Sequence, residues 1–129
     1  MAAMVKTYGL THINLAVPDI ERSKLFYGQV FGAVEIRREQ LDEGPMVMLN
    51  TPGSRDVVTL WQTGGPYGDM GSLRHFGFRL RDPGDIDRAL ADVVSAGGNV
   101  LRRGDRGSDE CFAFVTDPDG YKIELWYED

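Results

Sequence analysis

The sequence contains very little cysteine and no long apolar run. Its single cysteine, Cys111, excludes a disulfide within the chain and is compatible with a reducing compartment. The opening residues, Met1 to Lys6, lack the apolar stretch of a signal peptide, and no segment is apolar for long enough to span a bilayer as a helix. We therefore expect a cytoplasmic protein without a membrane partner.

Basic side chains are also scarce. The chain has 14 Lys and Arg against 20 Asp and Glu, which gives a formal net charge of −6 at pH 7. Because nucleic-acid backbones and anionic membranes are bound by basic surfaces, this balance argues against both as partners. It leaves a small-molecule substrate open, since a pocket can be locally positive. The length of 129 residues fits one compact domain or two small repeats that share a core.

Both histidines of the chain lie in similar segments. The segment Gly9–Val17 aligns with Ser72–Leu80, and this places His12 and His75 at the same position of an alternating strand pattern. An internal repeat is the simplest explanation of the match.

A helix is predicted after each of these strands. Asp19 and Asp85 are expected N-caps, because a carboxylate there can accept hydrogen bonds from the first turn. The first helix is expected to end at Gly32 and the second at Gly97. Apolar residues at three-and-four spacing mark one face of each helix: Ile20, Phe26, Tyr27 and Val30 in the first, and Ile86, Leu90, Val93 and Val94 in the second.

Three short strand candidates follow each helix. The closing strands, Val57–Trp61 and Lys122–Trp126, end in the same Leu-Trp dipeptide, which Thr59 precedes in one copy and Glu124 in the other. The sequence therefore predicts a single α+β domain over residues 1–129, built from two βαβββ modules. The first module covers about 7–62, the linker 63–71 and the second module about 72–128. Two such modules are expected to form a cup-shaped, barrel-like mixed sheet with the helices outside.

Strand alternation predicts which side chains enter the cup. Ile13, Leu15 and Val17 share one face of their strand, so His12 and Asn14 share the other. The same reasoning places His75 and Glu124 on the face opposite the helix. One strand histidine is more often a packing or surface residue than a ligand. Two at equivalent positions of a repeat, with a carboxylate on the same face, favour binding of one divalent metal ion.

Other residues are weaker candidates. Asn14, Thr59 and Trp61 are expected to line the cup and contact substrate. Phe112 and Phe114 have a pattern typical of core residues, so Cys111, which precedes them in the alternating pattern, could face the cup with a reactive thiol. A buried inert cysteine is the more common case. A cluster of arginines could bind an anion or be solvated: Arg102, Arg103 and Arg106.

Two segments resemble the vicinal oxygen chelate superfamily, which includes glyoxalases, bleomycin-resistance proteins and extradiol dioxygenases. The first is His12–Asp19, and the second is Phe114–Leu125, in which an Asp-Pro-Asp-Gly turn leads into a strand that carries Glu124. The resemblance extends over Leu10 to Tyr127. It implies that His12, His75 and Glu124 bind one ion of Fe2+, Mn2+, Ni2+ or Zn2+, and that a small substrate binds through its oxygens. It also implies a homodimer whose sites are shared between chains.

The chain departs from this family at Thr59. Members commonly carry a fourth ligand there, often Glu. Because this chain has a neutral hydroxyl instead, the resemblance argues against lactoylglutathione lyase and methylmalonyl-CoA epimerase chemistry. Extradiol dioxygenases usually have additional histidines, and fosfomycin thiol transferases have a Ser-rich loop where this chain has Arg102–Ser108. We expect a metal-dependent enzyme of dioxygenase-like or lyase/isomerase-like type. The alternatives are a bleomycin-resistance-type binding protein and a fosfomycin-type thiol transferase.

Overall fold

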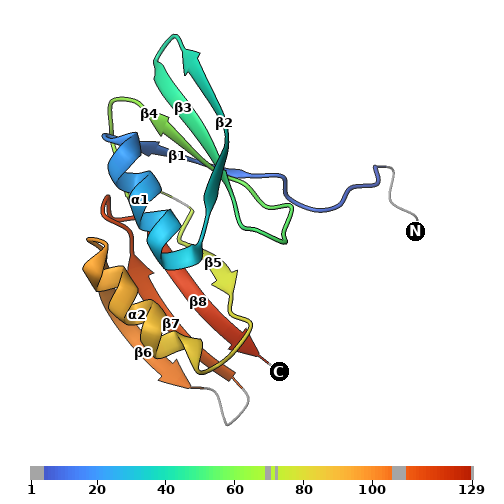
Figure 1. The fold of residues 1–129 in the computed structure, drawn as a ribbon, viewed down its shortest axis with the longest axis vertical. Helices are drawn as coiled ribbons and strands as arrows, with labels where there is room; N and C mark the ends of the chain where they lie inside the picture. Colours follow the sequence, from blue (N-terminus) through green and yellow to red (C-terminus); the bar gives the residue numbers. More distant parts are fainter. Residues whose placement is uncertain (1–4, 69–70, 72, 106–109, 129) are drawn as a thin grey trace.

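Two four-stranded mixed sheets, each with one helix, make up the fold (Figure 1). The computed structural model describes residues 5–68, 71, 73–105 and 110–128. The first sheet has the strand order β1-β4-β3-β2 and the second the order β5-β8-β7-β6. The elements of the first unit are β1 (Ile13–Val17), α1 (Ile20–Phe31), β2 (Val34–Leu41), β3 (Gly44–Asn50) and β4 (Val58–Gln62). Those of the second are β5 (Phe76–Arg79), α2 (Asp85–Ser95), β6 (Asn99–Asp105), β7 (Glu110–Thr116) and β8 (Lys122–Glu128).

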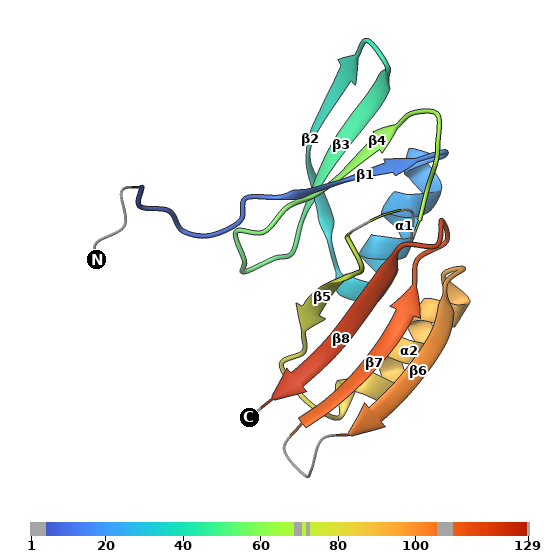
Figure 2. The same cartoon turned by 180° about the vertical axis from the view of Figure 1, so that it is seen from behind.

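The two units have the same topology. In each, the first strand pairs in parallel with the last, and the remaining pairings are antiparallel. The predicted α+β class with two βαβββ units is therefore confirmed. Within one chain, however, the two sheets are separate and do not close into a barrel. Each sheet keeps one face that its own helix does not cover, and in Figure 2 this face of the second sheet is turned toward the viewer.

The first helix begins and ends as predicted. The Asp19 carboxylate accepts hydrogen bonds from the backbone N–H groups of Glu21 and Arg22, at 3.1 and 3.2 Å. At the other end, Gly32 has φ of 70°, a left-handed conformation that favours glycine. Sequence signals at both ends are therefore sufficient to define α1.

The prediction that Asp85 caps the second helix is wrong. Gly84 is the N-cap of α2, no side chain caps it, and Asp85 is its first helical residue. The reason lies in the preceding turn, where the Asp82 carboxylate accepts a hydrogen bond from the N–H of Gly84 at 2.8 Å. The carboxylate that accepts a backbone hydrogen bond here is thus that of Asp82, in the turn before the helix, and not that of Asp85.

The helices join the two units. Helix α1 packs against β3 and β4, α2 packs against β6 and β7, and the helices contact each other. The rings of Phe31 and Phe78 stack across the junction, with centroids 3.9 Å apart. The apolar core therefore lies on the helix side of both sheets. Its fully buried members include Val17, Phe26, Leu60, Val93, Val115, Ile123 and Leu125.

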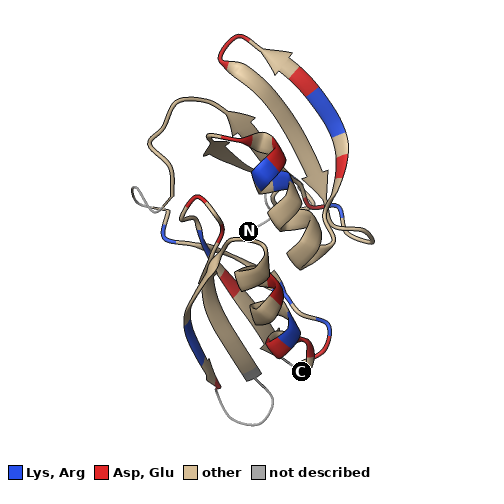
Figure 3. Ribbon diagram, turned by 60° about the vertical axis from the view of Figure 1, so that its left-hand side comes forward, with Lys and Arg blue, Asp and Glu red and all other residues tan. Residues whose placement is uncertain are grey.

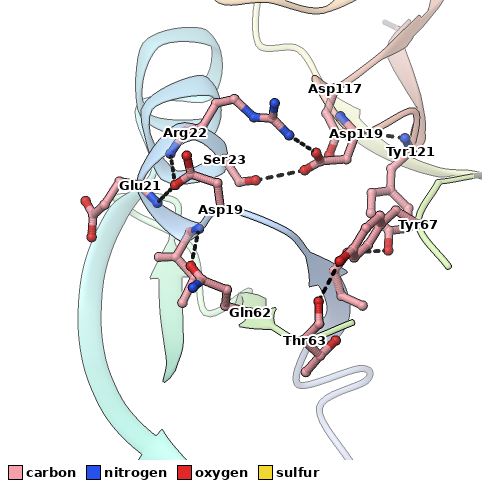
Figure 4. A network of polar contacts seen from close by, with 12 residues as sticks. Asp19, Glu21, Arg22, Ser23, Gln62, Thr63, Tyr67, Asp117, Asp119 and Tyr121 are labelled. Carbon is pink, nitrogen blue, oxygen red and sulfur yellow. Dashed lines mark hydrogen bonds and ion pairs between the residues drawn. The ribbon is translucent and has the colours of Figure 1, made fainter. Parts of the chain in front are cut away.

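A polar cluster ties the turn before β8 to α1 (Figure 4). The Tyr27 hydroxyl donates a hydrogen bond of 2.7 Å to the Asp117 carboxylate, and the Ser23 hydroxyl donates one of 2.9 Å to Asp119. Arg22 also forms an ion pair with Asp119. The other Asp117 oxygen accepts from the N–H groups of Asp119 and Tyr121. The Asp-Pro-Asp-Gly turn is thus fixed from both modules, and with it the register of β8.

No helix within the described ranges is both long enough and apolar enough to cross a membrane.

Candidate metal centre

The second sheet brings two of the expected ligands together. Nε2 of His75 lies 3.3 Å from Oε1 of Glu124, with 36% and 17% of the two side chains exposed. His75 immediately precedes β5, and Glu124 lies in β8, the strand that pairs in parallel with β5. The flanking β8 residues Ile123 and Leu125 are fully buried on the helix side, so Glu124 projects from the open face.

The first sheet repeats this arrangement with one change. The residue two positions after His75 is Gly77, whose Cα partner in the register is Glu124. The residue two positions after His12 is Asn14, whose Cα partner is Thr59. Thr59 therefore occupies the position in the first unit that Glu124 occupies in the second.

Within one chain, His12 is separate from His75 and Glu124. Among the described residues, no group of three or more His, Cys, Asp and Glu side chains is close enough to hold a metal ion. His12 lines a cavity of about 360 Å³, whereas His75 lines a different cavity of about 300 Å³. Within one chain, the expected ligands thus fall into two separate groups, His12 by itself and His75 with Glu124.

The imidazole of His12 is oriented by its neighbour. Its Nδ1 lies 2.7 Å from the Thr11 hydroxyl, while its side chain is otherwise exposed. Such a contact at one ring nitrogen leaves the other nitrogen for a metal ion.

The three residues expected to contact substrate lie on the first sheet. Asn14 is exposed and lines the same cavity as His75. Trp61 is partly buried and donates from its indole N–H to the carbonyl of Gly44 at 3.2 Å. Thr59 is 3% exposed, and its hydroxyl has no hydrogen-bond partner among the described residues. A buried hydroxyl without a partner is uncommon and indicates a place for a ligand or a water molecule.

Of the two interpretations of Cys111, the one in which it faces the cup is wrong, and the buried cysteine is confirmed. Cys111 is buried in the apolar core together with its alternating neighbours Ala113 and Val115. Phe112 and Phe114 therefore lie on the open face, contrary to their core-like pattern. In the sequence, two alternating aromatic residues on a strand are typical of a face that packs in the core. The pairing of Phe114 with Glu124 in the register shows that the two rings lie beside Glu124.

Two arginines of the cluster, Arg102 and Arg103, lie on opposite faces of β6. Arg103 pairs with Asp87 of α2 on the helix side, while the guanidinium of Arg102 lies over the ring of Phe112 on the open face. Arg106 lies outside the described residues.

Sequence reasoning missed two residues beside His75. The ring of Phe114 meets the imidazole of His75 edge-on, with centroids 5.0 Å apart. The ammonium of Lys122 lies 4.7 Å from the centroid of the same Phe114 ring. Lys122 precedes Glu124 by two residues, so strand alternation alone places it on the ligand face.

Three titratable groups with raised pKa values lie in or against the turn that leads into β8. Burial raises the pKa of the Asp117 carboxyl, although hydrogen bonds from Tyr27 and the backbone oppose this effect. Burial, with the neighbouring Asp117 charge, also raises the pKa of Tyr27 well above its usual value. Burial likewise raises the pKa of Tyr121, whose hydroxyl donates to the carbonyl of Ala16 at 2.6 Å.

Known proteins resemble the chain both in sequence and in structure. A lactoylglutathione lyase from Neisseria meningitidis serogroup A is 32% identical over 125 residues, covering 90% of this chain and 88% of that protein. A lactoylglutathione lyase from Arabidopsis thaliana is 31% identical over 122 residues, covering 88% of this chain, which spans only 42% of that longer protein.

Solved structures share the fold. A glyoxylase/bleomycin resistance protein/dioxygenase domain from Frankia sp. EAN1pec matches with a TM-score of 0.80 at 20% identity, covering 96% of this chain and 100% of that one. A variant of the fosfomycin resistance protein FosX from Listeria monocytogenes matches with a TM-score of 0.74 at 18% identity, covering 93% and 90%. It was crystallised with Mn(II) and 1S,2S-dihydroxypropylphosphonic acid.

A family model also matches the chain, over residues 9–125, which includes all three expected ligands. The chain belongs to the Glyoxalase/Bleomycin resistance protein/Dioxygenase superfamily.

Proposed function

We propose that this protein is a divalent-metal-dependent enzyme acting on a small oxygen-chelating substrate, with a site completed by two copies of the chain. His75 and Glu124 of one copy and His12 of the other would bind one ion. The observation that carries the proposal is the 3.3 Å approach of His75 to Glu124 on an open sheet face, while His12 occupies the equivalent place on the other open face.

The donor set fits such an ion. Two imidazole nitrogens and one carboxylate suit Fe2+, Mn2+, Ni2+ or Zn2+ and leave coordination positions open. The contact between Thr11 and His12 orients one imidazole, and the ring of Phe114 packs against the other. A two-fold axis would let each copy supply one half-site to each of two sites, because His12 and His75 of one chain line different cavities.

When bound, the ion would act as a Lewis acid on two substrate oxygens. The residues of the first sheet would hold and orient the substrate: the Asn14 amide can donate or accept, and the Thr59 hydroxyl can donate. With Thr59 at this position, the first half-site has no carboxylate to act as a base. This supports chemistry that does not require a second carboxylate, of lyase, isomerase or dioxygenase type. The sequence likeness to lactoylglutathione lyases favours the lyase or isomerase class, while Thr59 in place of a carboxylate argues for a reaction other than that of the lactoylglutathione lyases themselves.

Metal analysis tests the proposal. Protein purified without chelator or affinity tag should hold close to one divalent ion per chain. His75→Ala and Glu124→Ala should each lower the affinity by about a hundredfold or more, because each removes a direct ligand. Glu39→Ala is the matched control, since that carboxylate pairs with Arg37 at the far edge of the first sheet.

Equally weak binding of Mn2+, Fe2+, Ni2+ and Zn2+ by wild type and Glu124→Ala would contradict an enzyme of this type. It would favour a protein that binds and sequesters a small molecule. Assays for lactoylglutathione turnover and for oxygen consumption with catechols then separate the reaction classes.

A further inference from the structure

The open face of the second sheet carries two aromatic rings beside the His75–Glu124 pair. We call Phe112 and Phe114 the aromatic platform. Their ring centroids lie 6.0 Å apart with an interplanar angle of 70°. Each ring lies beside a cation: the Arg102 guanidinium carbon is 5.4 Å from the Phe112 centroid, and the Lys122 ammonium is 4.7 Å from the Phe114 centroid. Both distances are within the range of a cation–π interaction.

The backbone fixes the platform next to the metal half-site. Phe114 is the Cα partner of both Glu124 in β8 and Arg102 in β6, so the ring stands between them. The absence of a side chain at Gly104 makes room for Phe112, because a Cβ atom there would lie 2.7 Å from the end of its ring. The two rings are therefore fixed beside the half-site before any ligand arrives, and each lies within cation–π range of one of the two cations.

Lys122 and Arg102 differ from several other cations of the chain, which form ion pairs. On the helix side, Arg103 pairs with Asp87 and Lys24 pairs with Glu35. At the outer strand of the first sheet, Figure 3 shows acidic and basic segments alternating along β2, where Arg37 pairs with Glu39. Among the described side chains, Lys122 and Arg102 form no ion pair. Within the described part of the second sheet, these two positive charges thus have aromatic rings rather than carboxylates as their partners.

We propose that the substrate carries an anionic oxygen group, in addition to the oxygens at the metal, and that Lys122 binds this group with the help of Arg102. This inference rests on the proposed metal function of His75 and Glu124. Lys122 lies two residues before Glu124 on the same face, which is about 7 Å along a strand. Lys122 and His75 also line one cavity of about 300 Å³. A small molecule can therefore reach both the ion and the ammonium.

The first sheet would cover the rest of such a substrate with a neutral surface. Its open face carries Thr59, Met46 and Met48, which are neighbours in the register, and Trp61 beside Met46. Met46 is 6% exposed. The substrate class is thus a compact oxygen chelator with an anionic group at one end and an apolar body at the other.

The first arm of the test uses the Mn2+-loaded protein and two matched probes. Catechol and protocatechuate have the same pair of vicinal hydroxyls, and protocatechuate carries one additional carboxylate. Calorimetric titration of wild type should give a dissociation constant about tenfold lower for protocatechuate, because a charge-assisted contact is added. In Lys122→Met the two constants should become nearly equal, and Lys122→Arg should restore most of the difference.

Two controls accompany this arm. Lys24→Met removes a paired cation from the helix side and should leave the ratio unchanged. The Mn2+ content of Lys122→Met should match that of wild type, since Lys122 is not a ligand. A ratio that stays the same in Lys122→Met would overturn the inference while leaving the metal proposal intact.

The second arm works without metal, so it separates the two proposals. Benzoate and benzyl alcohol are titrated into metal-free protein and followed by ligand-observed NMR. Benzoate should bind at least about tenfold more tightly than benzyl alcohol, and Lys122→Met should abolish this preference. Phenylphosphonate in place of benzoate distinguishes a carboxylate site from a phosphonate site.

If Mn2+ fails to bind but the benzoate preference depends on Lys122, the anion subsite stands and the metal proposal falls. Benzoate binding that is absent from wild type, or equal in wild type and Lys122→Met, sinks the anion subsite whatever the metal does.

Discussion

Thr59 and Glu124 occupy the same register position in the two units, each opposite the residue that follows its histidine by two places. The two half-sites are therefore alike in backbone but unlike in chemistry. One presents an imidazole and a carboxylate 3.3 Å apart, and the other an imidazole and a buried hydroxyl that has no partner among the described residues. This asymmetry limits the expected coordination to three protein ligands and leaves the first sheet free to contact substrate.

Substitutions at position 59 test this reading. Thr59→Val removes the hydroxyl at nearly constant volume, so metal content should remain as in wild type. The free energy of unfolding in urea should rise by about 1 kcal/mol, because an unpaired buried polar group is removed. Thr59→Glu should tighten metal binding by adding an anionic ligand and should lower turnover by occupying an open position. A large loss of metal in Thr59→Val would show that the hydroxyl is a ligand.

The buried Asp117 should make a pH-dependent contribution to stability. Its pKa is raised in the folded protein by burial, so its favourable contribution is present below the unfolded pKa of about 3.9 and is lost as pH rises through the folded value. Asp117→Asn lacks this titration. Urea unfolding should therefore show Asp117→Asn gaining stability relative to wild type as pH rises from about 4 through the raised pKa of Asp117. A difference that is constant with pH would contradict this.

Glu35 provides a control of opposite sign. Hydrogen bonds from Arg38 and Lys24 lower the pKa of this carboxyl to about 2, so its contribution is present above the unfolded pKa and is lost as pH falls toward 2. Glu35→Gln should lose stability relative to wild type at neutral pH and not at acid pH. The pair lies at the surface, so the effect should stay below about 1 kcal/mol.

Cys111 should behave as a core residue. It is 9% exposed and packs with Ala113 and Val115, so a thiol reagent such as Ellman's reagent should label it slowly in buffer and rapidly in denaturant. Cys111→Ser should lower the free energy of unfolding by about 1–3 kcal/mol, because it buries a hydroxyl without an assured partner. Rapid labelling of the native protein, at a rate equal to that in denaturant, would refute the core assignment.

The fold could be predicted from the sequence because each signal was local and occurred twice. Asp19 and Gly32 mark the ends of α1, and the alternation around His12 recurs around His75. The N-cap prediction for α2 was wrong because a nearby carboxylate accepts the backbone hydrogen bond in the preceding turn. Asp82 takes the turn N–H that precedes α2, so Asp85 lies inside the helix and does not cap it.

The candidate site was only partly predictable for a different reason. In β1 and β8, buried aliphatic residues alternate with polar ones, so the sequence predicted correctly which side chains face the helix. In β7, aromatic residues occupy the open face and a small cysteine the core, so hydrophobicity alone assigned the faces in reverse. The separation of His12 from the other two ligands depends on how the helices pack, and no local sequence pattern encodes that packing.

Mixing two defective chains tests the shared site most directly. Chains carrying His12→Ala and chains carrying Glu124→Ala are combined under conditions that allow subunits to exchange. In a heterodimer with shared sites, one site collects both substitutions and the other is fully wild type. With random exchange about half of the dimers are mixed, so about a quarter of all sites should regain tight metal binding. Recovery near zero, in a mixture shown by mass spectrometry to contain heterodimers, would contradict a site shared between chains.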